Sequence, residues 1–219
     1  MPVPATTGKL CATIQEMEIG DYIIWKSIYG VLDYDFVDNI NELTEVPITG
    51  QVWAQDLTNY YWYGVKIAKG LIVSDRIVKI NVSWDTLNSN KLIQGKPETL
   101  GGVSGIIRSL TGGVAYADVN GNKSTTDQGT GLTFPTINEF DKYILGFDQT
   151  KIQSGKTLAD VFHHDVIKTW TQDTPIISIA ASTNRVARGG TTGTNNFSYL
   201  SSSTANTTVG FRPVFEYQE

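Results

Sequence analysis

The chain has 219 residues and a net charge of −5, with 11% aromatic and 18% charged residues. A chain of that length can bury a sizeable core, and its composition argues against disorder and favours a β-rich globular fold. The acidic balance, without a cluster of Lys and Arg, disfavours a nucleic-acid partner. No apolar stretch is long enough to span a bilayer, and residues 1–5 do not resemble the start of a signal peptide. We therefore expect synthesis in a cytoplasm and no membrane insertion.

The first 76 residues are predicted to form a β-region, because β-branched and aromatic residues concentrate at 19–25 and 60–67. Residues 60–63 are four adjacent aromatics, which a strand would divide between its two faces. We expect them to pack against the rest of the chain rather than to form an exposed contact patch. The acidic residues at 33–38 are typical of a charged edge strand, the alternative being a site for a divalent cation.

Cys11 is the only cysteine, so an intrachain disulfide is excluded. It stands in a short periodic segment at 10–14 and is expected to be buried as a small apolar side chain. Residues 69–76 and 77–82 are predicted to form two consecutive strands.

Two helices are predicted in the middle of the chain. Ser83 can cap a helix over residues 84–92. Thr136 and Glu139 have the spacing of a capping box, in which each side chain bonds the backbone N–H of the other residue. Apolar residues then recur at helical spacing over 137–144, which predicts the clearest helix of the chain.

Thr157 and Asp160 repeat the spacing of a capping box before a third, short helix. On that helix Asp160, His163 and His164 lie at positions i, i+3 and i+4, a spacing that a metal site can use. Because no further ligand cluster can be named elsewhere, we expect instead solvated histidines that suit the helix C-terminus.

Residues 96–134 are rich in turns. Asn120 followed by Gly121, between short apolar segments, predicts a hairpin with a type I′ turn. Asp118 opens a segment of alternating oxygen side chains that could bind calcium. Lys123 stands at the sixth position, where a calcium loop of the EF-hand type needs Gly, so we expect no metal here.

Two strands near the C-terminus are predicted to flank a long uncharged loop. Residues 185–190 and 209–215 have the pattern of strands, and residues 191–208 between them are mostly Ser, Thr, Asn and Gly. Small polar side chains with a few aromatics are the chemistry of an adaptable binding surface. The alternative is a solvated hairpin loop that binds nothing.

Four short motifs occur together in the second half of the chain, and the last of them lies close to its end. They are Pro-Thr-Ile-Asn-Glu-Phe at 135–140, Trp-Thr at 170–171, Arg-Val-Ala-Arg-Gly-Gly at 185–190 and Gly-Phe-Arg-Pro at 210–213. Their order resembles the formylglycine-generating, or sulfatase-modifying, branch of the C-type-lectin-like fold, over roughly residues 78–217. Residues 69–76, 83–88 and 107–113 also resemble tail or surface proteins of phages and prophages.

The resemblance implies an α+β, β-dominated chain in which a C-type-lectin-like domain at 77–219 follows the β-region at 1–76. The same framework serves the tropism determinants of phages, whose binding surface lies just before the Gly-Phe-Arg strand. The oxygen-dependent enzymes of this branch use a pair of thiols near the Arg-Gly-Gly motif. Cys11 is the only thiol of this chain, so we expect no such catalysis and no cofactor. The sequence motifs of calcium-dependent lectins are missing too.

The function we expect is host attachment by a phage or prophage protein located in the virion, at its tail or surface. Its partners would be a glycan or protein on the host cell and other virion proteins, and low charge with many aromatics suggests a homo-oligomer, with a trimer expected. The alternatives are a structural tail or decoration protein without a ligand and a degenerate enzyme of the sulfatase-modifying type. The predicted contact residues are Asn195, Asn196, Phe197 and Tyr199, with Trp170 as a neighbour.

One residue of the framework carries a structural prediction of its own. Arg212 follows the core residue Phe211 in the Gly-Phe-Arg-Pro motif. We expect it to be partly buried and held by backbone carbonyls or a carboxylate, since a buried charge needs partners.

Overall fold

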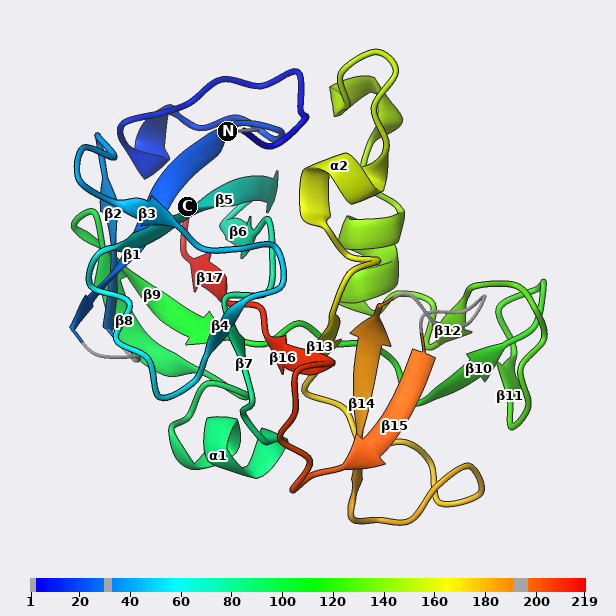
Figure 1. The fold of residues 1–219 in the computed structure, drawn as a ribbon. Coiled ribbons are helices and arrows are strands. Elements are labelled where there is room, and N and C mark those ends of the chain that lie inside the picture. The colour runs from blue at the N-terminus through cyan, green and yellow to red at the C-terminus, as the bar shows by residue number, and fades with distance from the viewer. Residues whose placement is uncertain (1–2, 30–32, 191–196) are drawn as a thin grey trace.

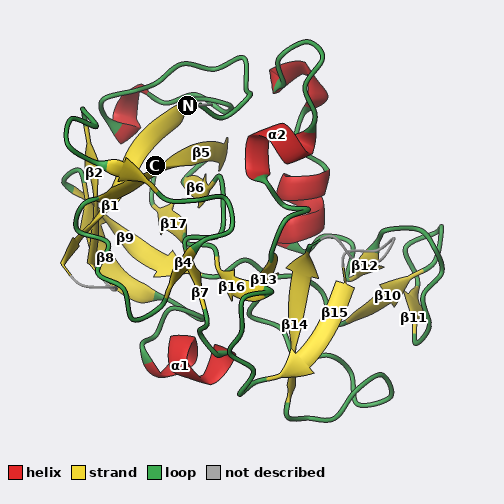
Figure 2. Ribbon diagram, viewed as in Figure 1, coloured by secondary structure: helices red, strands yellow, loops and turns green. Residues whose placement is uncertain are grey.

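The computed structural model describes residues 3–29, 33–190 and 197–219. It is an α+β structure dominated by strands, which form three sheets, with only short helices between them (Figures 1 and 2). Within these residues, no helix has the length and apolar character needed to cross a membrane.

The largest sheet has the strand order β2-β1-β5-β6-β17-β9-β8, with β3 beside β5. Its strands are β1 (Tyr22–Tyr29), β2 (Asp33–Val37), β3 (Thr44–Glu45), β5 (Tyr60–Ala68), β6 (Leu71–Ser74), β8 (Lys96–Leu100), β9 (Val103–Arg108) and β17 (Val214–Tyr217). Its two edge strands, β2 and β8, are joined by side chains of β2: Lys96 Nζ in β8 lies 2.6 Å from the carboxylate of Asp33, and the N–H of Gly101, just after β8, donates to the carboxylate of Asp35 at 2.8 Å. The sheet is therefore curled, and these acids bind protein groups.

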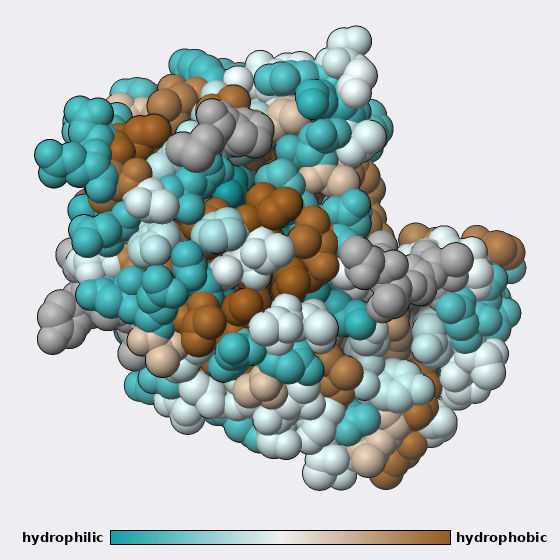
Figure 3. Space-filling model, in the orientation of Figure 1, coloured by the Kyte–Doolittle hydropathy of each residue, from teal (hydrophilic) through white to brown (hydrophobic). Residues whose placement is uncertain are grey.

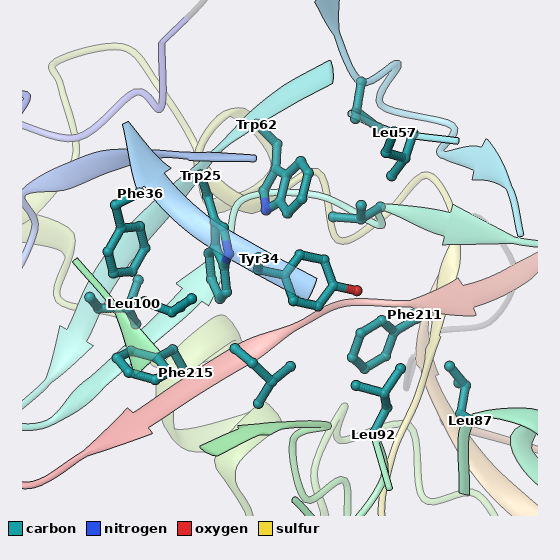
Figure 4. Close-up of a cluster of buried hydrophobic side chains, with 14 of the residues drawn as sticks. Trp25, Tyr34, Phe36, Leu57, Trp62, Leu87, Leu92, Leu100, Phe211 and Phe215 are labelled. Carbon is teal, nitrogen blue, oxygen red and sulfur yellow. The ribbon is translucent and has the colours of Figure 1, made fainter. Parts of the chain in front are cut away.

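The inside of the curled sheet is filled by aromatic side chains (Figure 4). Trp25 and Trp62 are opposite each other in the β1–β5 register, with their rings 6.0 Å apart, and Phe36 packs on Phe215 at the same distance. Aromatic pairs at such separations add to the burial of apolar area. The prediction that residues 60–63 pack rather than form an exposed patch is confirmed, because Tyr61, Trp62 and Tyr63 are buried.

The second sheet has the order β15-β14-β13-β16-β7-β4. Its strands are β4 (Gln51–Val52), β7 (Lys79–Ile80), β13 (Lys168–Trp170), β14 (Asn184–Gly189), β15 (Phe197–Ser201) and β16 (Val209–Phe211). Strands from both sides of the predicted boundary at 76/77 contribute to each of the two larger sheets. The structure therefore shows no separation of the chain at that point.

A small third sheet joins β10 (Ala115–Ala117) to β11 (Lys123–Ser124) and β12 (Thr133–Phe134). The predicted hairpin between β10 and β11 is present, but its type I′ turn is wrong, because only Gly121 and not Asn120 has a positive φ. The carboxylate of Asp118 instead accepts the backbone N–H groups of Asn120 and Asn122, both at 2.8 Å. In the described part of the chain, no group of acidic, His or Cys side chains lies together in a way that could hold a metal.

The helices are α1 (Trp84–Ser89), α2 (Leu158–Phe162), the π-helix η2 (Phe140–Leu145) and the 3₁₀ turns η1 (Ile14–Glu16) and η3 (Gln149–Lys151). The Ser83 cap of α1 is confirmed, since its hydroxyl accepts the Thr86 N–H at 3.0 Å, although the helix ends earlier than predicted. The capping box of Thr157 and Asp160 is also confirmed.

The capping box predicted at Thr136 is wrong. Glu139 does not bond back to the backbone of Thr136; its carboxylate pairs with Arg108 at 2.5 Å and accepts the Thr111 N–H at 2.9 Å. The side-chain oxygen of Asn138 instead accepts the Asp141 N–H at 3.0 Å. The helix starts at Phe140, with Glu139 as its N-cap residue.

The histidines after α2 are not solvated as predicted. His163 and His164 are partly buried, and burial lowers the pKa of both imidazoles. Cys11 is buried as expected, and burial next to Asp21 raises the pKa of its thiol to about 11.

The interior holds several arginines. Arg212 is fully buried, and its Nη1 donates to the Ser74 carbonyl at 2.7 Å, which confirms the prediction from sequence. Burial lowers the pKa of Arg212 to about 10, whereas the nearby Asp75 raises it. Arg188 is also fully buried and pairs with the buried Asp141 at 2.5 Å. Replacing Arg188 would leave a buried carboxylate without its ion pair, whereas replacing Arg212 would leave a backbone carbonyl without its donor.

Replacing Arg188 by Met should destabilise the protein by about 3–5 kcal/mol, because Asp141 would become an unpaired buried charge. Replacing Arg212 by Met should cost about 1–3 kcal/mol, since it leaves only the Ser74 carbonyl without its donor while Asp75 keeps Arg76. Urea unfolding of the two variants measures the difference. Equal losses, or a larger loss for Arg212→Met, would contradict this ranking.

Candidate contact surface

The predicted contact residues map onto the hairpin of β14 and β15 at one edge of the second sheet (Figure 1). Phe197 opens β15 and Tyr199 lies in its middle. Asn195 and Asn196 lie outside the described residues. Because β15 is the last strand of its sheet, one side of its main chain faces away from the sheet.

The register of the hairpin divides its side chains between two faces. Arg188 is opposite Phe197 and Val186 is opposite Tyr199, so these four share one face. The other face carries Arg185 opposite Leu200, and Leu200 packs against the main core. One face of the hairpin is therefore anchored to the core, and the other carries the predicted contact residues.

A short row of aromatic rings crosses the contact face. The ring of Phe197 lies 5.0 Å from that of Tyr116 in β10 and 6.5 Å from that of Tyr199. Phe197 is 9% exposed, whereas Tyr199 is 39% exposed. Burial raises the pKa of the Tyr116 phenol, and the neighbouring Tyr199 and Asp127 raise it further. Phe197 thus supports the row from beneath, and Tyr199 is its exposed ring.

Tyr116 was not among the predicted contact residues. It is a single aromatic in a three-residue strand of a different sheet, and only the tertiary fold brings it to Phe197. No local pattern in the sequence could have identified this neighbour. The small sheet of β10, β11 and β12 therefore borders the candidate surface.

The structure removes Trp170 from the predicted contact set. It is completely buried, and its indole Nε1 donates to the Val82 carbonyl at 2.9 Å. It lies in β13 opposite Ala187, and its side chain belongs to the main core. The Trp-Thr motif therefore supplies packing beneath the hairpin and not a ligand contact.

The end of β14 next to Phe197 is fixed by the guanidinium of Arg188. Its Nη1 donates to the Gly112 carbonyl at 2.6 Å and to the Thr133 hydroxyl at 2.8 Å, and Nη2 pairs with Asp141. The guanidinium also lies 4.6 Å from the ring centre of Phe140. One side chain thus ties β14 to η2, to β12 and to the segment before β10.

Asp141 completes this network with its second oxygen. Its Oδ2 accepts the backbone N–H of Thr133 at 3.0 Å, the Thr133 hydroxyl at 2.6 Å and the Asn138 amide at 2.6 Å. A buried carboxylate with this many donors is well satisfied and has little freedom to move. The base of the aromatic row is therefore held by a specific polar network.

The opposite end of the hairpin is docked on α1. The guanidinium of Arg185 stacks over the Trp84 ring at 4.4 Å and donates to the Ser182 and Asn184 carbonyls. The Ser202 hydroxyl donates to Asp85 at 2.9 Å. With both ends held, the hairpin presents Tyr199 from a supported strand.

A hollow of about 280 Å³ has Ile14, Ile23 and Phe36 on its wall, near the edges of the curled sheet and away from this hairpin. Figure 3 shows apolar surface over the middle of one face of the molecule. Ile48, just before β4, and Val52 in β4 are exposed. On the candidate surface itself, Tyr199 is the exposed ring of the edge strand β15.

No protein-family model, no curated protein and no solved structure matches the chain.

Phe197 and Tyr199 should contribute differently to the stability of the fold, because the first ring is buried and the second is exposed. Phe197→Ala should destabilise the fold by about 3 kcal/mol, because it empties a buried site against Tyr116. Tyr199→Ala should change stability by about 1 kcal/mol or less, because the ring is largely exposed. Thermal unfolding of both variants checks this, and a large loss for Tyr199→Ala would show that Tyr199 is part of the scaffold.

Proposed function

We propose that this chain is a non-catalytic attachment protein of a phage or prophage virion, carried on the tail or surface. In this proposal it binds a glycan or protein of the host cell through residues 191–208, which were predicted to be one loop and of which Phe197–Ser201 form the strand β15. Its second half would have the C-type-lectin-like fold of the formylglycine-generating branch, with no cofactor.

The arrangement of the sequence motifs supports the proposed fold. Three of the four motifs lie on adjacent strands, in the order β14, β13 and β16. Residues 185–190 span β14, Trp170 ends β13, and the Gly-Phe pair of 210–213 ends β16. The fourth motif supplies Glu139, which pairs with Arg108. Motifs that were separate in sequence therefore belong to one continuous framework next to the candidate surface.

The observation that carries the binding proposal is the exposed Tyr199 on a supported, uncharged edge strand. No charged residue stands between Arg188 and Arg212. A rigid aromatic anchor surrounded by small polar side chains is the usual energetic centre of a binding loop. The proposed contacts are Tyr199, with Phe197 behind it, and Asn195 and Asn196 from the loop.

A second candidate function is structural, as a virion component that contacts only other virion proteins. The apolar surface near β4, with Ile48 and Val52 exposed, favours such an assembly contact. The same surface is where we place the contact between copies in the proposed homo-oligomer, for which a trimer with closed cyclic symmetry is expected.

The binding proposal predicts that Tyr199→Ala weakens attachment about tenfold to a hundredfold, equivalent to about 1–3 kcal/mol. Binding of the purified, fluorescently labelled protein to cells of the bacterium that hosts the gene measures this. Ile19→Ala is a matched control, because the exposed fraction of Ile19 (43%) is similar to that of Tyr199 (39%). Ile19 lies in the turn before β1, which belongs to a different sheet from β15. Attachment should also depend weakly on salt, since the strand carries no charge.

Three outcomes separate the candidates. Loss of binding with Tyr199→Ala and not with Ile19→Ala supports attachment through β15. Equal binding by both variants places the contact elsewhere on the molecule. Absence of binding by the wild type, together with antibody labelling spread over the particle, favours the structural function.

A further inference from the structure

Both histidines of the chain occupy one turn. The sequence has only two, His163 and His164, and they follow α2 directly. Histidine is the side chain whose ordinary pKa falls between pH 5 and 8, so changes in imidazole charge in this range are confined to this turn. His163 has a positive φ of 44° and ends the helix in a left-handed conformation.

Charges from two other connections act on the imidazoles of this turn. Burial lowers the pKa of His163; Asp75, which follows β6, and Asp165 of its own turn raise that pKa, whereas Arg76 and Arg212, which follow β6 and β16, lower it. His164 is near Arg212, Asp165 and His163, and it has a hydrogen bond to the Leu158 backbone.

The two arginines differ in whether a carboxylate is bonded to them. Arg76 is neutralised by Asp75 and Glu45, each at 2.6 Å. Arg212 has the Ser74 carbonyl as its acceptor, and its Nε is buried without a hydrogen-bond partner in the described structure. The Nδ1 atom of His164 is likewise buried without a hydrogen-bond partner in the described structure. A proton added to the His164 imidazole therefore places a new positive charge near the buried Arg212, which has no carboxylate bonded to it in the described structure.

The same turn holds the end of β14. The His164 carbonyl accepts the Gly190 N–H at 2.8 Å. Gly189, with a φ of +85°, approaches this carbonyl so closely that a Cβ at position 189 would lie 2.3 Å from the oxygen. Gly189 and Gly190 directly follow Arg188, which is opposite Phe197 in the register. The histidine turn is thus in contact with the root of the candidate contact surface.

We propose that the turn of His163 and His164 is a pH-sensitive joint: protonation of the partly buried imidazoles loosens the packing of the turn and releases the end of β14 at Gly190.

The direction of the effect follows from linkage between protonation and packing. Burial holds the pKa of both imidazoles below the ordinary value of 6.5, so the packed turn binds fewer protons than a released turn. Packing is therefore fully stable above about pH 6.5. The packing weakens as the pH falls through that value. The stability that the neutral imidazoles contribute to the packed turn is completely lost below their pKa values in that turn.

Amide hydrogen exchange of the full-length protein, followed by NMR between pH 7 and pH 5, tests the joint. After correction for intrinsic exchange rates, the protection factor of the Gly190 amide should fall roughly tenfold for each unit by which packing lowers an imidazole pKa. The midpoint should follow the titration of the His163 and His164 ring protons. The Ser202 amide, bonded to the Thr183 carbonyl at 2.9 Å at the other end of the hairpin, is the internal control and should keep its protection.

The double variant His163→Gln/His164→Gln keeps the backbone carbonyl of residue 164 and removes the titrating groups. Protection of Gly190 that no longer changes between pH 7 and pH 5 in this variant supports the joint. A Gly190 amide in the wild type whose protection is constant through the histidine titration overturns it. So does a fall of the same size in the double variant. The wild-type result decides the question even if the variant fails to fold.

Discussion

The candidate surface depends above all on one buried ion pair, between Arg188 of β14 and Asp141 of η2. Taking two charges out of water costs several kcal/mol each, so such a pair adds little stability by itself. Losing one partner is costly, because the other charge then stays buried without compensation. The pair therefore acts as a specific link: alternative positions of β14 would leave a guanidinium or a carboxylate unsatisfied. Through Thr133 and Gly112 the same network fixes the segments around the small third sheet.

This constraint explains how the short, uncharged strand β15 is held in a defined position. The strand has five residues, two of them serines, so its position depends on its neighbours. Arg188 fixes β14 beside it at one end, and the stacking of Arg185 on Trp84 fixes β14 at the other. Phe197 is held at the Arg188 end against Tyr116. Tyr199 is the exposed large side chain of β15.

Local patterns in the sequence predicted much of the fold. Alternation and β-branched residues identified β1, β2 and β5, and the cap at Ser83 and the box at Thr157 marked the starts of α1 and α2. The burial of Arg212 was also predicted, from its place next to the core residue Phe211 in the Gly-Phe-Arg-Pro motif. These features are decided within a few residues, which is why sequence alone suffices for them.

The failures share a different cause, which is competition from distant residues. Glu139 has the spacing of a capping residue, but Arg108, 31 positions earlier, takes its carboxylate. Trp170 suits a contact surface by type, and only the pairing of β13 between β14 and β16 shows that it faces the core. His163 and His164 looked solvated because their partial burial depends on the tertiary fold and not on neighbouring residues in the sequence. Tyr116 reaches Phe197 for the same reason.

A double-mutant cycle on Arg188 and Asp141 tests the importance of the ion pair most directly. Unfolding free energies would be measured for Arg188→Met, Asp141→Asn and the double variant, with the double variant expected to be far less destabilised than the sum of the single changes. A coupling energy of about 2–3 kcal/mol is the predicted result, since each single change leaves the other group buried and unpaired. Additive losses, with a coupling energy near zero, would contradict the account.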